Sequence, residues 1–287
     1  MARRAVVPDE VAARRVIDGA DVMDTIGREA PVLRDIAREA AAVLMRGYRS
    51  GVVAEHKSAI DLVTAWDRAS EDVIRQSTAA RLPGVTLMAE ESAGAGFPDG
   101  LTLWADPLDG TTNFVHGHPF FAVSLGLADG PTLLAAAVVA PALQLEWHGA
   151  RGAGAFRSGA ACHVSGTKTL GDALLATGFP YDNPTNPQNN FREFAALTMR
   201  SRGVRRCGSA ALDLCLVADG TFDGYWERFL KPWDLAAGAL LVSEAGGRVT
   251  DLRGSTGDFR TGWLLASNGH VHDELVRAVG DAAGTVE

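Results

Sequence analysis

Hydrophobic positions at helical spacing mark the first long element of the chain. Between Arg28 and Gly47, apolar side chains recur every three or four residues. These apolar positions are Leu33, Ile36, Ala37, Ala40 and Leu44. The pattern predicts an amphipathic helix that ends at Gly47, a residue type that commonly terminates helices.

A second helix and a short strand are predicted next. The helix should run from about Thr64 to Arg81, because a Pro-Gly pair at 83–84 ends it. The apolar run from Val85 to Ala89 then predicts a strand. We expect this strand to place Glu90 and Glu91 at its end.

Several strands should follow. Leu101–Ala105 is a strand candidate that ends at Asp106, and long β-like runs follow at Phe120–Leu127 and Thr132–Ala140. The Gly-rich segment 149–159 is typical of hairpins and of a boundary between structural units. Apolar strands and helices resume near Leu174, Phe191, Ala210 and Leu235.

This order favours a layered α+β fold over a regularly alternating doubly wound sheet. We expect an N-terminal extension at residues 1–27, an N-terminal α+β subdomain at 28–150 and a C-terminal α/β subdomain at 151–287. The two subdomains should pack against each other.

Composition and charge limit the function classes. The chain has 287 residues, 47% of them hydrophobic, and a formal net charge of −8 without a block of Lys and Arg. Nucleic acid is therefore not expected as a partner. No apolar run is long enough for a membrane span, and the three cysteines lack CxxC spacing, which indicates a reducing cytoplasm and no structural zinc.

The segment 104–114, WADPLDGTTNF, is the strongest chemical signal in the sequence. Asp106 and Asp109 lie three residues apart around a proline, so a tight turn can direct both carboxylates at one point. Their mutual repulsion would then require a cation. The following Gly110 and Thr111 are typical of a helix start, where free N–H groups suit phosphate oxygens.

Three other acidic positions are ambiguous when each is taken alone. Asp234, in the segment KPWDLAAGALLVSEAGG, is typical of a helix N-cap. The Glu90–Glu91 pair in MAEES is typical of a solvated turn. Asp61 and Asp67 are typical of acidic residues on a protein surface.

Taken together, these motifs carry a family resemblance. AEES, DPLDGTTNF and WDLAAGALLVSEAGG, in this order and at these separations, resemble the inositol monophosphatase family over residues 28–279. The resemblance implies a layered αβαβα sandwich of the sugar-phosphatase type, usually a homodimer. It also implies an Mg²⁺-dependent, lithium-sensitive phosphomonoester hydrolase, most simply an inositol-1-monophosphatase.

The resemblance further implies a role for individual residues. Glu90, Asp106 and the carbonyl of Leu108 would bind a first Mg²⁺, and Asp106, Asp109 and Asp234 a second. A weaker third ion would lie near Glu90, with Asp67 close by through water and with Lys57 in a nearby loop. Thr111 would orient the water that attacks phosphorus. The substrate would contact Asp109, Gly110, Thr111, Ser209, Ala210 and Glu227.

The expected reaction is in-line attack on phosphorus by a metal-activated water, with a small phosphorylated polyol as substrate. Histidinol phosphatase, fructose-1,6-bisphosphatase and nucleotide phosphatase remain open, because all share the metal cluster. An inactive regulatory binding protein on the same fold is the alternative from another class.

Overall fold

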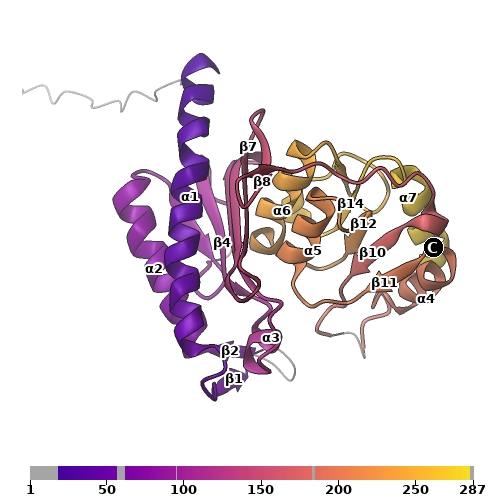
Figure 1. The fold of residues 1–287 in the computed structure, drawn as a ribbon, viewed down its shortest axis with the longest axis horizontal. Helices are drawn as coiled ribbons and strands as arrows, with labels where there is room; N and C mark the ends of the chain where they lie inside the picture. Colours follow the sequence, from indigo (N-terminus) through magenta and orange to yellow (C-terminus); the bar gives the residue numbers. More distant parts are fainter. Residues whose placement is uncertain (1–18, 57–61, 95, 183–184, 285–287) are drawn as a thin grey trace, which may run out of the picture.

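Helices and sheets alternate in five layers, α–β–α–β–α, as expected (Figure 1). The computed structural model describes residues 19–56, 62–94, 96–182 and 185–284. Lys57, Asp61 and the first 18 residues of the predicted extension lie outside the described residues.

The first layer consists of α1 (Gly19–Gly47) and α2 (Ala65–Arg81). The five apolar positions predicted for α1 are all fully buried against the first sheet. The helix nevertheless begins nine residues before the predicted start at Arg28. The apolar pattern there is irregular, and helix ends depend on local capping more than on the period of the buried face.

The first sheet has seven strands in the order β3-β4-β5-β6-β7-β8-β9. These strands are β3 (Thr86–Ala89), β4 (Leu101–Asp109), β5 (Ala122–Asp129), β6 (Thr132–Ala140), β7 (Leu145–Ala150), β8 (Gly154–Arg157) and β9 (Ala160–Ala161). Only the pair β3–β4 is parallel. The predicted hairpins at 149–159 belong to this sheet, which extends past residue 150 to Ala161.

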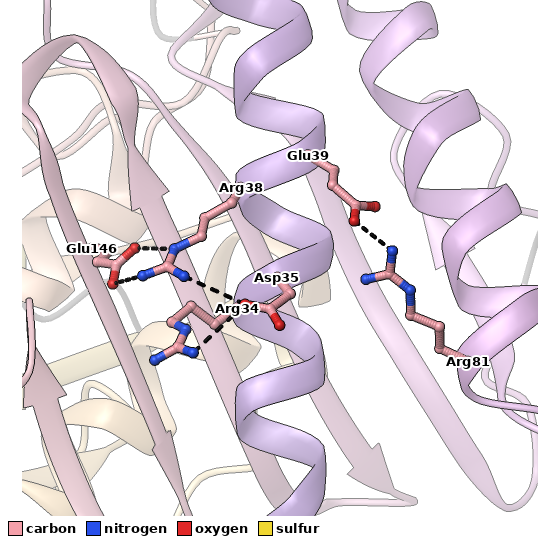
Figure 2. Close-up of polar contacts among 6 residues, drawn as sticks. All are labelled: Arg34, Asp35, Arg38, Glu39, Arg81 and Glu146. Carbon is pink, nitrogen blue, oxygen red and sulfur yellow. Dashed lines mark hydrogen bonds and ion pairs between the residues drawn. The ribbon is translucent and has the colours of Figure 1, made fainter.

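Ion pairs connect α1 with its neighbours (Figure 2). Arg38 donates two hydrogen bonds of 2.6 Å to the carboxylate of Glu146 on β7, and also lies 3.4 Å from Asp35. On the other side of α1, Glu39 pairs with Arg81 of α2. Exposed pairs of this kind contribute about 0–1 kcal/mol each, so burial of the apolar face remains the main stabilising term for this layer.

The central layer is formed by α5 (Ala210–Ala218) and α6 (Pro232–Glu244), which lie between the two sheets. The helix α6 contacts β5 very closely. A Cβ at Gly126 would lie 2.6 Å from the Cβ of Ala236 and 2.7 Å from the backbone nitrogen of Ala237. The absence of a side chain at Gly126 therefore sets how close α6 lies to the first sheet.

The second sheet has five strands in the order β11-β10-β12-β14-β13. These are β10 (Leu174–Thr177), β11 (Gly203–Arg205), β12 (Gly224–Glu227), β13 (Arg248–Thr250) and β14 (Leu264–Ser267). Its outer face is covered by α4 (Phe191–Arg200) and α7 (His272–Ala283) (Figure 1).

The fold also contains smaller elements. The short helix α3 (Thr111–Val115) follows β4 directly, and β1 (Ala54–His56) and β2 (Leu62–Thr64) form a two-stranded hairpin. Within the described residues, we find no helix with the length and apolar character needed to cross a membrane.

Candidate active site

The strand β4 contains a β-bulge at the acidic motif. Asp106 pairs with Ser124 of β5, and Asp109 pairs with Ala122, so three steps along β4 correspond to two along β5. In a regular strand, residues three apart point to opposite faces. The extra residue places Asp106 and Asp109 on the same face, toward α6. The predicted strand end at Ala105 was therefore wrong, because the strand continues through the bulge.

Backbone and hydroxyl donors hold both carboxylates of this motif. Asp106 Oδ1 accepts a hydrogen bond of 2.9 Å from the N–H of Leu108. Asp109 Oδ2 accepts from the Ser209 hydroxyl at 2.6 Å and from the Ala211 N–H at 2.8 Å. Asp109 thus links β4 to the start of α5, where the positive end of the helix dipole favours a carboxylate.

Two further carboxylates come from other elements. Asp234 lies in the first turn of α6 and accepts a hydrogen bond of 2.7 Å from the N–H of Lys231. Asp234 is therefore not the N-cap that its sequence position predicts: the N-cap is Lys231, and Asp234 lies three residues later and accepts from the N-cap backbone. Asp234 also lines the cavity of the site. Glu90 follows the end of β3, where its N–H donates to the carbonyl of Ala105 on β4.

The carboxylates raise one another's pKa. Burial raises the pKa of Asp106 well above its usual value, and the charges of Glu90, Asp109 and Asp234 add to this effect. Burial also raises the pKa of Asp109 to about 6, although its hydrogen bonds oppose the shift. The pKa of Asp234 is raised by burial first and then by Glu90. A bound cation would offset the repulsion between these buried carboxylates, so the cluster favours cation binding.

The start of α3 lies at the end of the acidic strand. Gly110 has φ of +94°, and a Cβ there would lie 3.0 Å from the carbonyl oxygen of Phe120. The Thr111 hydroxyl lies 3.0 Å from Asp67 Oδ1 and 3.1 Å from the carbonyl oxygen of Leu108. Asp67 itself is 1% exposed and caps α2 through the backbone N–H and hydroxyl of Thr64.

One face of α2 supports three segments of the site. Asp67 contacts Thr111, and the Ser70 hydroxyl donates to the carbonyl of Pro107 at 2.8 Å. Glu71 accepts a hydrogen bond of 3.0 Å from the backbone N–H of Glu91. Positions i, i+3 and i+4 share a helix face, so this single helix sets the relative placement of the three segments.

The opposite wall of the site comes from the second half of the chain. Ser209 and Ala210 form the start of α5, and Glu227 ends β12. Glu227 is 8% exposed and accepts a hydrogen bond from the Tyr225 hydroxyl. A Cβ at Gly178 would lie 2.2 Å from both carboxylate oxygens of Glu227, so the glycine makes room for this side chain.

A cavity of about 750 Å³ joins these residues. It is lined by the predicted residues Glu90, Asp106, Leu108, Asp109, Gly110, Thr111, Ser209, Ala210, Glu227 and Asp234. Asp67 does not line the cavity and lies behind Thr111. The structure thus brings together ten of these predicted residues and places the eleventh, Asp67, one contact away.

Sequence reasoning missed several residues at the site. Arg206 and the buried Asp213 line the cavity near Glu227, and Ser70 and Glu71 support its other wall. Asp213 could have been found, because it is the one acidic residue in the otherwise apolar helix α5. Arg206, which precedes the GSAA segment, carries no comparable signal.

The donor set fits a hard divalent cation. Four carboxylates and the Leu108 carbonyl supply oxygen, the ligand type that Mg²⁺ prefers. Among the residues that the structure describes, no three acidic, His or Cys side chains converge at ligand distance around a common point. Hydrogen bonds from backbone and hydroxyl donors hold the carboxylates of Asp106, Asp109 and Asp234.

Comparison with known proteins agrees with this geometry. The family model described as the inositol monophosphatase family matches residues 29–283. An inositol-1-monophosphatase from Synechocystis is 45% identical over 230 residues, covering 79% of each chain. The Nus factor SuhB from Pseudomonas aeruginosa is 43% identical, covering 81% of this chain and 88% of its own. The structure of an inositol monophosphatase from Anabaena superposes with a TM-score of 0.83 at 40% identity, covering 90% and 97% of the two chains.

Proposed function

The chain belongs to the inositol monophosphatase family of phosphoric monoester hydrolases, and we propose that its own substrate is an inositol monophosphate. The observation that carries this proposal is the convergence of Glu90, Asp106, Asp109 and Asp234 on one cavity beside the start of α3. The second wall of that cavity presents Glu227, a carboxylate suited to accepting hydrogen bonds from hydroxyl groups.

We propose Mg²⁺ as the metal of this metal-dependent family, with two to three ions per site. Glu90, Asp106 and the Leu108 carbonyl would hold one ion, and Asp106, Asp109 and Asp234 another. A weaker third would lie near Glu90. Bound cations would neutralise charge on the phosphate and lower the pKa of the attacking water.

Thr111 and Asp67 are suited to orienting that water. When the Thr111 hydroxyl donates a hydrogen bond to Asp67 Oδ1, 3.0 Å away, its oxygen can still accept a hydrogen bond from water. The backbone N–H groups at Gly110 and Thr111 would bind phosphate oxygens, because they lie at the start of a helix.

The polyol would lie against Ser209, Ala210 and Glu227. Ser209 and Ala210 are held in place by the hydrogen bonds of Ser209 and Ala211 to Asp109. This coupling means that the same loop contacts the metal ligand and the alcohol, so a correctly placed polyol would align its phosphate with the acidic cluster.

Phosphate release measured on a panel of substrates tests the proposal. The panel contains myo-inositol 1-phosphate, glycerol phosphate, histidinol phosphate, fructose 1,6-bisphosphate and adenosine monophosphate, each with Mg²⁺ or with EDTA. We expect kcat/KM to be highest for the inositol ester and release to require Mg²⁺. A higher kcat/KM for one of the other esters would assign that alternative, and absence of release from all of them would refute catalysis.

Asp109→Asn is the matching variant. Asn can still accept the hydrogen bonds from Ser209 and Ala211, so the fold should persist while kcat falls at least about a hundredfold. Asp129→Asn, at an exposed acid at the end of β5, is the control. Near-normal turnover in Asp109→Asn would contradict the assignment.

We further propose a cytoplasmic homodimer that lithium inhibits, with no membrane or nucleic-acid partner. The three cysteines, Cys162, Cys207 and Cys215, are free thiols, which supports a reducing compartment. Size-exclusion chromatography with light scattering tests the dimer, and a lithium titration of phosphate release tests inhibition.

A further inference from the structure

Besides Trp233, three aromatic side chains line the cavity: Phe179, Tyr181 and Phe229. We call them the aromatic rim. Tyr181 is 60% exposed and Phe229 is 41% exposed, which places both among the exposed large hydrophobic residues in the described part of the chain. Exposed apolar surface at a cavity is a common sign of a ligand contact.

Two of these rings follow the ends of neighbouring strands. β10 and β12 run parallel, and Thr177 pairs with Trp226 near their carboxyl ends. Phe179 and Phe229 come two and three residues after this pair, and both line the cavity together with Glu227. In open sheets of parallel strands, ligands bind in the crevice at the carboxyl ends of the strands.

Neighbouring aromatic side chains pack against these two rings and fix their positions. Phe179 packs against Phe191 and Phe194, with ring centroids 4.7 Å and 5.5 Å apart. Phe229 packs edge to face against Trp263 at 5.9 Å. Their positions are therefore set before any ligand arrives, which lowers the entropic cost of binding.

The backbone at Phe229 is strained. Its φ is +63°, in the left-handed region that bulky residues rarely adopt. The preceding Arg228 is buried and paired with Glu193 of α4, which anchors the backbone next to the strained residue. Strain of this kind is concentrated at functional sites, and here it presents an aromatic ring at the cavity.

The cavity is also large, and its lining contains both acidic and aromatic residues. Its volume of about 750 Å³ lies in the range that holds drug-sized ligands. Its lining combines acidic side chains, among them Glu227, with the aromatic rim. A substrate that contacts both kinds of residue would carry hydroxyl groups and a flat apolar group.

We propose that, in addition to an inositol monophosphate, the site takes phosphomonoesters whose alcohol carries a planar unsaturated ring beyond its hydroxyl-bearing part, with the ring stacked on the aromatic rim. This inference rests on the proposed phosphatase function and adds a second recognition element to it. Nucleoside monophosphates are the simplest molecules of this class, because a sugar separates the phosphate from the base.

A matched pair of substrates measures the contribution of the aromatic rim to kcat/KM. Adenosine 5′-monophosphate and ribose 5-phosphate share the same phosphate ester and differ only in the base. We expect kcat/KM in Mg²⁺ to be about tenfold higher for the nucleotide, within the range that stacking of one base on an aromatic side chain provides. myo-Inositol 1-phosphate is measured in parallel as the reference for activity.

Variants then test whether the aromatic rim causes the preference for the nucleotide over ribose 5-phosphate. Phe229→Ala and Tyr181→Ala, made separately, should each lower the ratio of the two kcat/KM values toward one. Phe229→Leu keeps apolar bulk without a flat ring and should retain only part of the ratio. Phe97→Ala removes a ring that is 55% exposed but lies outside the cavity, and should leave the ratio unchanged. Thermal unfolding of each variant confirms that it is folded.

The possible failures are distinguishable. Hydrolysis of the inositol ester without a preference for the nucleotide over ribose 5-phosphate overturns the inference and leaves the proposed function standing. A preference that persists in both alanine variants also overturns the inference, because the base would then be held elsewhere. Absence of Mg²⁺-dependent release from all three esters means that the proposed function itself has failed.

Discussion

Glu227 faces the cavity from a buried position, and its ionisation depends on that burial. Loss of solvation raises its pKa from 4.5 to about 7, although the Tyr225 hydroxyl and Arg206 favour the charged form. A carboxyl whose pKa is raised by folding stabilises the folded state while it is protonated. The stabilisation that protonated Glu227 gives to the folded state is therefore complete below pH 4.5 and is lost as the pH rises toward 7.

Glu227→Gln should remove this pH dependence, because the amide keeps the acceptor for Tyr225 and cannot ionise. In EDTA, the free energy of unfolding of the wild-type protein should fall relative to that of the variant between pH 4.5 and pH 8, by about 3 kcal/mol at most. Urea unfolding across this range provides the measurement, with Asp129→Asn as the control. Parallel pH profiles for wild type and Glu227→Gln would contradict the assignment.

Among the elements, α2 has the most direct influence on the acidic cluster. Glu71 holds the backbone of Glu91, and Arg75 donates to both Glu71 and Ser92, so the turn that carries Glu90 depends on this helix. Supporting contacts of this kind orient metal ligands without touching the metal. Glu71 is thus a positioning residue for Glu90.

Glu71→Ala should weaken Mg²⁺ binding about 10- to 100-fold, because the N–H of Glu91 loses its acceptor. Glu71→Gln keeps an acceptor and should recover most of the affinity. Isothermal titration of the metal-free protein measures this directly, without a turnover assay. Asp72→Ala removes the neighbouring acid on the exposed side of α2 and should change little. Equal affinities in Glu71→Ala and wild type would refute the positioning role.

The helix α6 carries Asp234, and its distance from the first sheet depends on Gly126. Gly126→Ala would place a methyl group 2.6 Å from Ala236, so either α6 or β5 must move. We expect a loss of about 1–3 kcal/mol in the free energy of unfolding, together with weaker Mg²⁺ binding. Urea unfolding and calorimetric titration report the two effects. Gly280→Ala, in α7 where a Cβ meets open space, should instead be neutral or stabilising.

Most elements could be predicted from sequence because they bury one regular face. The apolar spacing of α1 and the Pro-Gly pair that ends α2 after Arg81 are local signals, and both predictions were confirmed. The bulge in β4 was missed, since nothing in the segment WADPLD distinguishes a turn after a strand from an extra residue within one. That distinction depends on pairing with β5, which lies outside the local sequence.

In the whole molecule, a net charge of −8 and a buried acidic cluster make stability depend on bound cations. A ligand that binds only the folded state stabilises it by mass action. At a concentration 100 times its dissociation constant, Mg²⁺ should raise the free energy of unfolding by about 2.7 kcal/mol. Thermal unfolding with MgCl₂, against NaCl at equal ionic strength, separates specific binding from screening. Asp109→Asn should reduce the shift, and an equal shift in NaCl would contradict a specific site.

The sequence predicted the acidic residues of the site better than the aromatic rim. Glu90, Asp106, Asp109 and Asp234 occur in dense motifs, whereas Phe179 and Phe229 are single aromatic residues in ordinary segments. Their role emerges only because β10 and β12 become neighbours in the second sheet. The same holds for Arg206, which reaches the cavity through tertiary packing alone.

The bulge in β4 also determines which residues of this strand face the cavity and which face the apolar core. If β4 paired with β5 without the extra residue, Leu108 would turn toward the cavity and Asp109 toward the apolar core that contains Phe114 and Phe121. A buried, unpaired carboxylate costs several kcal/mol, so this register is strongly disfavoured. Molecules that complete folding therefore carry an assembled acidic cluster, and specific activity should follow the folded fraction during refolding.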